Sequence, residues 1–246
     1  MGIKELCLRT LEADGRALLA AAGRDPQAPV AACPPWTVDK LVGHMGRIHT
    51  WVTHLVTSRA QERISSRDFD EGPDGDPAAR IEWAAERHAA LVEALRGVDE
   101  EEPVWGFLQG VGPARFWLAR QALETAMHRW DAQAATGEPE PVDADLGVLG
   151  VDEVLGVFLP RMAESAAAVS TAASMHLHCT DRDGEWLLRF GENGTALTHE
   201  HAKGDVAVRG GGGDLYLLLW NRIGHDRLQV FGDASLLDRW AARVSI

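Results

Sequence analysis

The stretch LETAMHRWDAQ, residues 123–133, decides how the first half of the chain is interpreted. Glu124 and His128 are four positions apart, so on a helix they share one face, about 6 Å from each other. The helix that carries them is predicted to run from about 114 to 135, ending before the run TGEPEPVD (136–143). The Glu–His face is either a solvated surface or two thirds of a metal site, and spacing within one helix leaves both open.

Three further helices are expected before this one, because apolar residues recur at helical spacing in each of them. They occupy residues 3–22, a stretch that begins at PPWTVDKL (34–41), and residues 77–97. Thr37 can cap the second helix, and Asp39 suits the positive end of its dipole. Asp76 followed by Pro77 is a strong start signal for the third. The pattern predicts a four-helix bundle over residues 1–138.

The second half of the chain has a different texture. The run GEPEPVDADLG (137–147) is rich in proline and acidic residues and is the best candidate for a linker. From Ser174 onward, short alternating apolar runs are separated by Gly, Asp and Asn, which predicts strands. Helices are expected at 145–169, 214–222 and 234–244. The predicted fold class is α+β, with the bundle followed by a smaller α+β domain over 145–246.

Composition excludes several classes of protein. The net charge is −13 over 246 residues and basic residues do not cluster, which argues against nucleic acid as a partner. No apolar run approaches the roughly 20 residues of a membrane span, and the N-terminus lacks the apolar segment of a signal peptide. With only three scattered cysteines, a disulfide framework is not expected. A cytoplasmic protein is predicted, and its oligomeric state is not specified.

A histidine in the second helix bears on the metal hypothesis. His44 lies within the apolar face of that helix, where a lone histidine is commonly a core residue. A bundle can nevertheless bring it to Glu124 and His128, and two histidines with one carboxylate form a common catalytic zinc set with one open position. The same nitrogen and oxygen ligands accept nickel, cobalt or iron. His88 on the third helix is either an outer donor that orients a ligand or a packed core residue.

Other histidines and a glycine run are interpreted as structural. His49 and His54 lie further round the second helix than His44 and are predicted to be surface or interface residues. The HEH pattern of His199 and His201 has strand spacing and is interpreted as an exposed edge. The run GGGG at 210–213 lacks the Lys-Ser/Thr ending of a phosphate loop, so it is predicted to be a flexible turn before a helix.

Two of these segments together resemble a known family. WTVDKLVGH (36–44), followed much later by ETAMHRWDA (124–132), is similar to the actinobacterial mycothiol-dependent maleylpyruvate isomerase family. Its metal-binding domain is a DinB-like helical bundle, and its C-terminal domain is related to sterol-carrier-like folds. DLYLLLWNR (214–222) and LQVFGD (228–233) resemble parts of that second domain. The resemblance implies that His44, Glu124 and His128 are the metal ligands, zinc being the first expectation.

The resemblance also implies a function. It implies a divalent-metal enzyme that uses the low-molecular-weight thiol mycothiol for transfer to, or cis–trans isomerisation of, a small electrophile. Arg222 matches an arginine of the family and would bind a substrate carboxylate, although it could equally cap the carbonyls at the end of its helix. The alternatives are a non-catalytic, metal-stabilised module that binds a small molecule or a protein, and metal-assisted hydrolysis.

Overall fold

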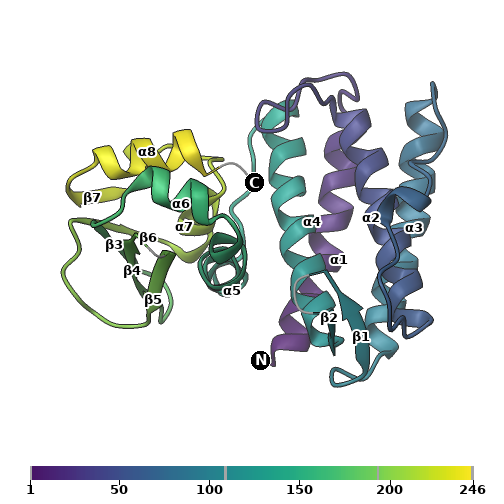
Figure 1. Cartoon of the computed structure of the whole chain (residues 1–246). Helices are drawn as coiled ribbons and strands as arrows, with labels where there is room; N and C mark the ends of the chain where they lie inside the picture. The colour runs from purple at the N-terminus through teal and green to yellow at the C-terminus, as the bar shows by residue number, and fades with distance from the viewer. Residues whose placement is uncertain (1, 108–109, 193, 245–246) are drawn as a thin grey trace. The chain divides into compact units, whose positions relative to one another are not determined.

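The computed structural model describes residues 2–107, 110–192 and 194–244 of the chain. It divides into two compact units, Met1–Glu140 and Pro141–Ile246. The first unit is built mainly of long helices, and the second holds a five-stranded sheet with shorter helices (Figure 1). The α+β class predicted from the sequence is therefore confirmed.

The first unit contains four long helices that run side by side (Figure 1). They are α1 (Ile3–Ala22), α2 (Val38–Thr57), α3 (Pro77–Gly97) and α4 (Arg115–Thr136). The starts of α2 and α3 follow from capping residues, because the Thr37 hydroxyl accepts from the Lys40 N–H and the Asp76 carboxylate accepts from the Ala78 and Ala79 N–H groups. In the packing, α1 lies mainly against α4, and α2 lies mainly against α3.

A hairpin that the sequence pattern does not predict precedes α4. Its strands, β1 (Pro103–Gly106) and β2 (Gly110–Pro113), pair antiparallel. Each has only four residues, too few to show the alternation by which strands are recognised. The indole N–H of Trp117 donates to the carbonyl of Trp105 at 2.9 Å, which ties the hairpin to the first turns of α4. A short 3₁₀ turn, η1 (Ser66–Asp68), lies in the connection between α2 and α3.

Helix α4 is enclosed on most of its circumference. Its polar stripe includes Gln121, His128 and Asp131, which are 1%, 9% and 2% exposed, respectively. The solvated-face interpretation of this stripe is therefore wrong. The reason is that α4 packs against both α1 and α2, so its polar face is turned into the bundle.

The second unit is built on one sheet with strand order β5-β4-β3-β6-β7. The strands are β3 (Ser174–Cys179), β4 (Glu185–Gly191), β5 (Gly194–Thr198), β6 (Val206–Gly210) and β7 (Gln229–Gly232). Only β3 and β6 are parallel among these pairs. Met175, Leu177, Trp186, Leu188 and Val208 are buried on one face of the sheet, and that face forms the core with the helices.

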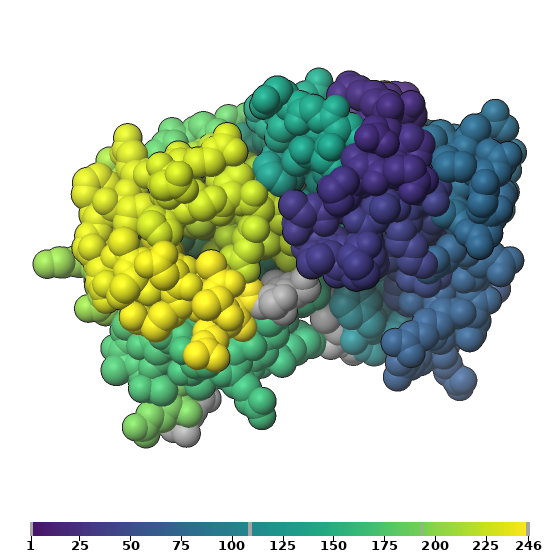
Figure 2. All heavy atoms as spheres, turned by 90° about the horizontal axis from the view of Figure 1, so that it is seen from above, coloured from purple at the N-terminus to yellow at the C-terminus, as the bar shows by residue number. Residues whose placement is uncertain are grey.

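Four helices complete this unit: α5 (Ala144–Glu153), α6 (Ala163–Val169), α7 (Gly212–Leu219) and α8 (Ser235–Arg243). Helix α8 buries Leu236, Leu237 and Trp240, and its outer side forms part of the surface shown in yellow in Figure 2. A 3₁₀ turn, η4 (His225–Arg227), precedes β7.

The single helix expected over 145–169 is not continuous. After α5 the chain passes through a π turn, η2 (Val154–Phe158), and a 3₁₀ turn, η3 (Leu159–Arg161), before α6 begins. Pro160 lies in η3 and has no N–H to donate, so an α-helical bond cannot form there. The prediction of one helix is therefore wrong at this point.

The glycine run that precedes the second predicted helix of the second half has a packing role. Gly210 ends β6, Gly211 is the N-cap of α7, and Gly212 and Gly213 form the first turn of that helix. A Cβ on Gly147 of α5 would lie 2.4 Å from the carbonyl carbon of Gly212. The glycines therefore let α5 and α7 approach backbone to backbone, which a flexible turn would not require.

We expect the Gly147→Ala variant to lower the free energy of unfolding by about 1–3 kcal/mol, the usual cost of overpacking. In an open helix the same change stabilises the protein, so the sign identifies the close contact. Gly156→Ala is the matched control in the same unit, because its Cβ would meet no atom closer than 4.0 Å. Urea unfolding of both variants checks the prediction, and equal stability of the two would contradict it.

Candidate metal centre

Three side chains from two helices converge in the bundle. His44 Nε2 of α2 lies 3.3 Å from Glu124 Oε1 of α4, and His128 Nε2 lies 3.5 Å from the same oxygen. One potential ligand atom from each residue lies within 4.8 Å of the other two. Ligands about 2.1 Å from a zinc ion in a tetrahedron are about 3.4 Å apart, so the observed spacing suits such an ion. The three residues form what we call the bundle cluster.

Each member on α4 has a charged partner that fixes its orientation. Arg120 is 4% exposed, and its Nη2 donates to Glu124 Oε2 at 2.7 Å, which leaves Oε1 facing the two histidines. His128 Nδ1 lies 3.0 Å from Asp131 Oδ2, whose side chain is fully buried. A carboxylate on Nδ1 holds that proton there and leaves Nε2 free to bind a cation. The donor set and its outer partners therefore fit a divalent metal.

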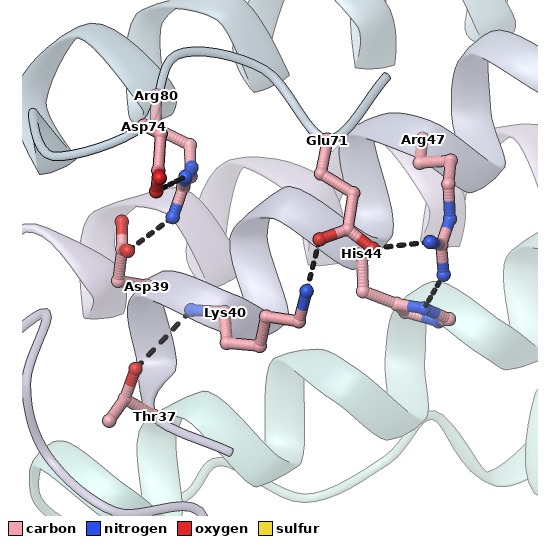
Figure 3. A network of polar contacts seen from close by, with 8 residues as sticks. All are labelled: Thr37, Asp39, Lys40, His44, Arg47, Glu71, Asp74 and Arg80. Atoms are coloured by element: carbon pink, nitrogen blue, oxygen red, sulfur yellow. Dashed lines mark hydrogen bonds and ion pairs between the residues drawn. The ribbon is translucent and has the colours of Figure 1, made fainter. Parts of the chain in front are cut away.

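His44 is linked to a network of ionic contacts along α2 (Figure 3). Glu71, in the connection between α2 and α3, contacts both Lys40 and Arg47. Arg47 Nη2 in turn lies 3.4 Å from His44 Nδ1. A guanidinium can only donate, so in this arrangement His44 carries its proton on Nε2. Binding of a cation at Nε2 therefore requires that Arg47 give up this long contact, and its contact with Glu71 remains available to it.

The electrostatics of the bundle cluster favour charged groups. Burial alone would raise the pKa of Glu124, but the Arg120 guanidinium and hydrogen bonds from the two histidines hold it well below its usual range. Burial also works against a charged His128, yet its contacts with Asp131 and Glu124 raise its pKa to about 9. Without a cation, the site therefore holds an ionised carboxylate and a protonated imidazole, and a metal must displace that proton.

We expect the Asp131→Asn variant to lower the pKa of His128 and to weaken metal binding about 10–100-fold, the effect typical of an outer partner. In the metal-free protein, the raised pKa of His128 contributes stability that is fully present below the unfolded value of 6.5 and is lost as pH rises through about 9. The variant should therefore lose most stability near pH 6 and least above pH 9.

Histidine NMR titrations and urea unfolding at both pH values check this expectation. Asp238→Asn, which removes the partner of His225 on the surface, is the control. It should change neither the pKa of His128 nor the pH dependence of the stability. A pKa of His128 that is unchanged by Asp131→Asn would contradict the role given to that carboxylate.

Of the other two histidines on α2, one is exposed as predicted from the sequence and the other is not. His54 is exposed, as expected. His49 is 3% exposed and lies 3.2 Å from the Thr125 hydroxyl, so its assignment to the surface is wrong. Helix α2 contacts both α3 and α4, and two of its faces are therefore buried. Burial, with His88 as the next cause, holds the pKa of His49 well below its usual range.

His88 packs in the core beside His49. Their ring centroids are 5.2 Å apart, and a Cβ on Gly15 of α1 would lie 2.2 Å from the His88 ring. This placement agrees with the packed-core alternative.

Arg222, after α7, donates to the Trp220 carbonyl at 2.9 Å, and its Cζ lies 6.0 Å from the centre of that indole. This hydrogen bond directly supports the alternative in which Arg222 caps the carbonyls at the end of its helix.

Sequence reasoning missed several residues that shape the bundle cluster. Arg120 precedes Glu124 by four positions, which is the spacing of a helical ion pair and could have identified it. The Trp36 ring lies 4.9 Å from that of His44, and Cys33 Sγ lies 3.8 Å from Asp131 Oδ2. Cys33, His128 and Asp131 form a second possible ligand group. The contact of Cys33 with Asp131 has no local signal, because the two residues are 98 positions apart, whereas Trp36 and His44 lie within the single motif WTVDKLVGH.

Both units of the chain match the profiles of known domain families. The profile of the mycothiol maleylpyruvate isomerase N-terminal domain matches residues 8–133. The profile of the MDMPI C-terminal domain matches residues 145–239. The chain belongs to the mycothiol-dependent maleylpyruvate isomerase family. The resemblance inferred from the two sequence motifs is thus confirmed.

Solved structures support the same fold for the family member described here. A crystal structure of a histidine-to-alanine variant of the mycothiol-dependent maleylpyruvate isomerase matches with a TM-score of 0.60 at 13% identity, covering 94% of this chain and 93% of that one. A second crystal structure of that isomerase matches with a TM-score of 0.53 at 14% identity and the same coverage. No curated protein matches by sequence. Within the described residues, no helix has the length and apolar character needed to cross a membrane.

Proposed function

We propose that this member of the family is a divalent-metal enzyme that uses a low-molecular-weight thiol, with His44, Glu124 and His128 as the metal ligands. The observation that carries the proposal is the convergence of these three side chains from α2 and α4. Two histidines and one carboxylate leave a position for a further ligand, as catalytic zinc sites do. Zinc is proposed first, and nickel, cobalt and iron suit the same donors.

The chain's own residues account for how such a site is prepared. Arg120 holds the far oxygen of Glu124, and Asp131 holds Nδ1 of His128, so the atoms left free point to a common centre. The metal, when bound, would lower the pKa of a coordinated thiol and make its thiolate available at neutral pH. His44 and His128 have to be neutral at their bound nitrogens, so protons leave the site as the cation enters.

We propose mycothiol as the thiol, and maleylpyruvate or a related small electrophile as the substrate. In an isomerisation, the thiolate adds to the double bond, the resulting single bond rotates, and elimination of the thiol restores a trans double bond. In a transfer, the thiol sulfur stays on the product. Arg222 is proposed to bind a substrate carboxylate, for which a two-pronged guanidinium is well suited.

The test is turnover by the purified full chain with zinc, with mycothiol and with maleylpyruvate, each omitted in turn. We expect the cis-to-trans change in ultraviolet absorbance only when metal and thiol are both present. A bimane electrophile tests thiol transfer in the same way. Metal binding without turnover across several thiols would favour a non-catalytic binding module, and turnover without thiol would favour metal-assisted hydrolysis. Either outcome contradicts the proposal.

A further inference from the structure

A second group of potential metal ligands lies in the C-terminal unit. On β3, His176 and His178 are two positions apart, so both point to the same side of the sheet. Glu185 of β4 is the cross-strand partner of His178 and points to that side as well. This is the side opposite the buried face that carries Met175 and Leu177. Three polar side chains are therefore brought together on the sheet by strand register alone.

A fourth side chain reaches the group from a loop. Strand β5 ends at Thr198, so His199 and His201 lie beyond it. The strand spacing predicted for this pair is therefore wrong, whereas its predicted exposure is confirmed. His201 Nδ1 lies 2.8 Å from Glu185 Oε2, whereas His199 Nε2 lies 3.0 Å from Asp152. The loop that carries His201 crosses close to β3 at Gly204, where a Cβ would lie 2.9 Å from the backbone nitrogen of His176.

The three imidazoles surround one carboxylate. His176 Nε2 lies 3.4 Å from Glu185 Oε2, and His178 Nδ1 lies 2.8 Å from Glu185 Oε1. The ring centroids of the three histidines are 5.4–6.2 Å apart. Ligand atoms from His176, Glu185 and His201 all lie within 4.8 Å of one another. We call these four residues the sheet cluster.

Two features distinguish the sheet cluster from a network of surface hydrogen bonds. His176 is 5% exposed although it is on the sheet face opposite the core, so its ring is enclosed by its neighbours. His178 Nδ1 is buried and close to Glu185, yet it has no hydrogen-bond partner of acceptable geometry. A buried ring nitrogen that lies beside a carboxylate oxygen and has no hydrogen bond calls for an explanation, and an unplaced ion is one.

The sheet cluster also borders a pocket that a ligand can enter. The pocket has a volume of about 500 Å³ and is lined by the three histidines, Lys203, Asp205 and Arg209. The charges of Lys203 and Arg209 are balanced by those of Glu185 and Asp205, so the pocket does not repel a cation by net charge.

We propose that the sheet cluster is a second divalent-metal site, with His176, His201 and Glu185 as ligands and His178 as a fourth. Three imidazoles with one carboxylate are a donor set that zinc and similar ions accept. The site uses residues of the C-terminal unit only, and it does not depend on the function proposed for the bundle cluster.

The experiment measures zinc binding by untagged full-length protein, freed of metal by dialysis against a chelator. In the His44→Ala/His128→Ala background, which removes the bundle cluster, we expect one zinc ion per chain by competition with a chromophoric chelator. Adding His201→Ala should lower the zinc affinity more than about 100-fold, since loss of even an outer partner costs 10–100-fold. Co²⁺ should give visible absorption bands that this change removes.

The matched control is His199→Ala, because His199 is also exposed and lies two positions away on the same loop. It should leave the zinc affinity unchanged. The side chain of His201 is 77% exposed, so its removal is not expected to unfold the protein, and circular dichroism verifies this. Absence of zinc binding in the His44→Ala/His128→Ala background, or equal losses in His199→Ala and His201→Ala, would overturn the proposal.

The wild-type chain provides an independent count. Two ions per chain, of which His201→Ala removes one and His44→Ala the other, is the result expected if both sites exist. A single ion that only His44→Ala removes would contradict the metal site at the sheet cluster and support the one at the bundle cluster. A single ion that only His201→Ala removes would support the site at the sheet cluster and contradict the one at the bundle cluster.

Discussion

Turnover by the His44→Ala variant should be at least about 1,000-fold slower than wild type, and the bundle cluster should no longer retain a metal ion. Metal catalysis is worth several kcal/mol, and each 1.4 kcal/mol corresponds to a factor of ten in rate. His44 is the member of the cluster that α2 supplies, so without it Glu124 and His128 offer a cation two ligands from one helix. That is fewer than a stable zinc site uses.

The control for this experiment is His54→Ala on the same helix. His54 is exposed, and the structure pairs its ring with that of Phe69 at 5.6 Å, away from the cluster. Its removal should leave both turnover and metal content within a factor of about two, as expected for a surface substitution. Metal content is counted by elemental analysis, with the sheet cluster disabled by His201→Ala. Full activity in His44→Ala would eliminate the proposed centre.

The largest expected effect on stability is that of Arg129→Met, a loss of about 3–5 kcal/mol of unfolding free energy. Arg129 is 2% exposed, and its Nε donates to Asp14 of α1 at 3.0 Å. Its Nη1 donates to Gln133 at 2.9 Å and to the Glu140 carbonyl at the end of the bundle unit. The substitution would leave the Asp14 carboxylate, itself 14% exposed, without this counter-ion. A largely buried charge that loses its counter-ion is costly because water solvates it poorly.

Two further variants separate this cause from a general loss of packing. Arg115→Met, on the same helix, removes an ion pair with Glu101 whose side chains are 51% and 72% exposed, and it should cost less than about 1 kcal/mol. The double variant Arg129→Met/Asp14→Leu should be more stable than the sum of its single changes, because the carboxylate that loses its counter-ion is removed as well. Urea unfolding is measured for wild type, for the single variants Arg129→Met, Asp14→Leu and Arg115→Met, and for the double variant. Equal losses for Arg129→Met and Arg115→Met would show that burial of the pair does not matter.

Much of the architecture follows from local sequence. The starts of α2 and α3 are set by Thr37 and by Asp76 with Pro77, whose caps act within three residues. Helical spacing of apolar residues located all four long helices, and alternation located most strands. The β1–β2 hairpin was too short for such a pattern, and the break near Pro160 was overlooked because the apolar spacing continues across it.

For the bundle cluster, the sequence by itself determined that Glu124 and His128 share one helical face, because four residues make about one turn. Only the tertiary structure decided that His44 joins them from 80 residues away and that Arg120 and Asp131 fix their free atoms. It also decided that His201 leaves its expected strand to meet Glu185 beside His176. Such meetings depend on packing between distant segments, and no local pattern encodes the energy of that packing.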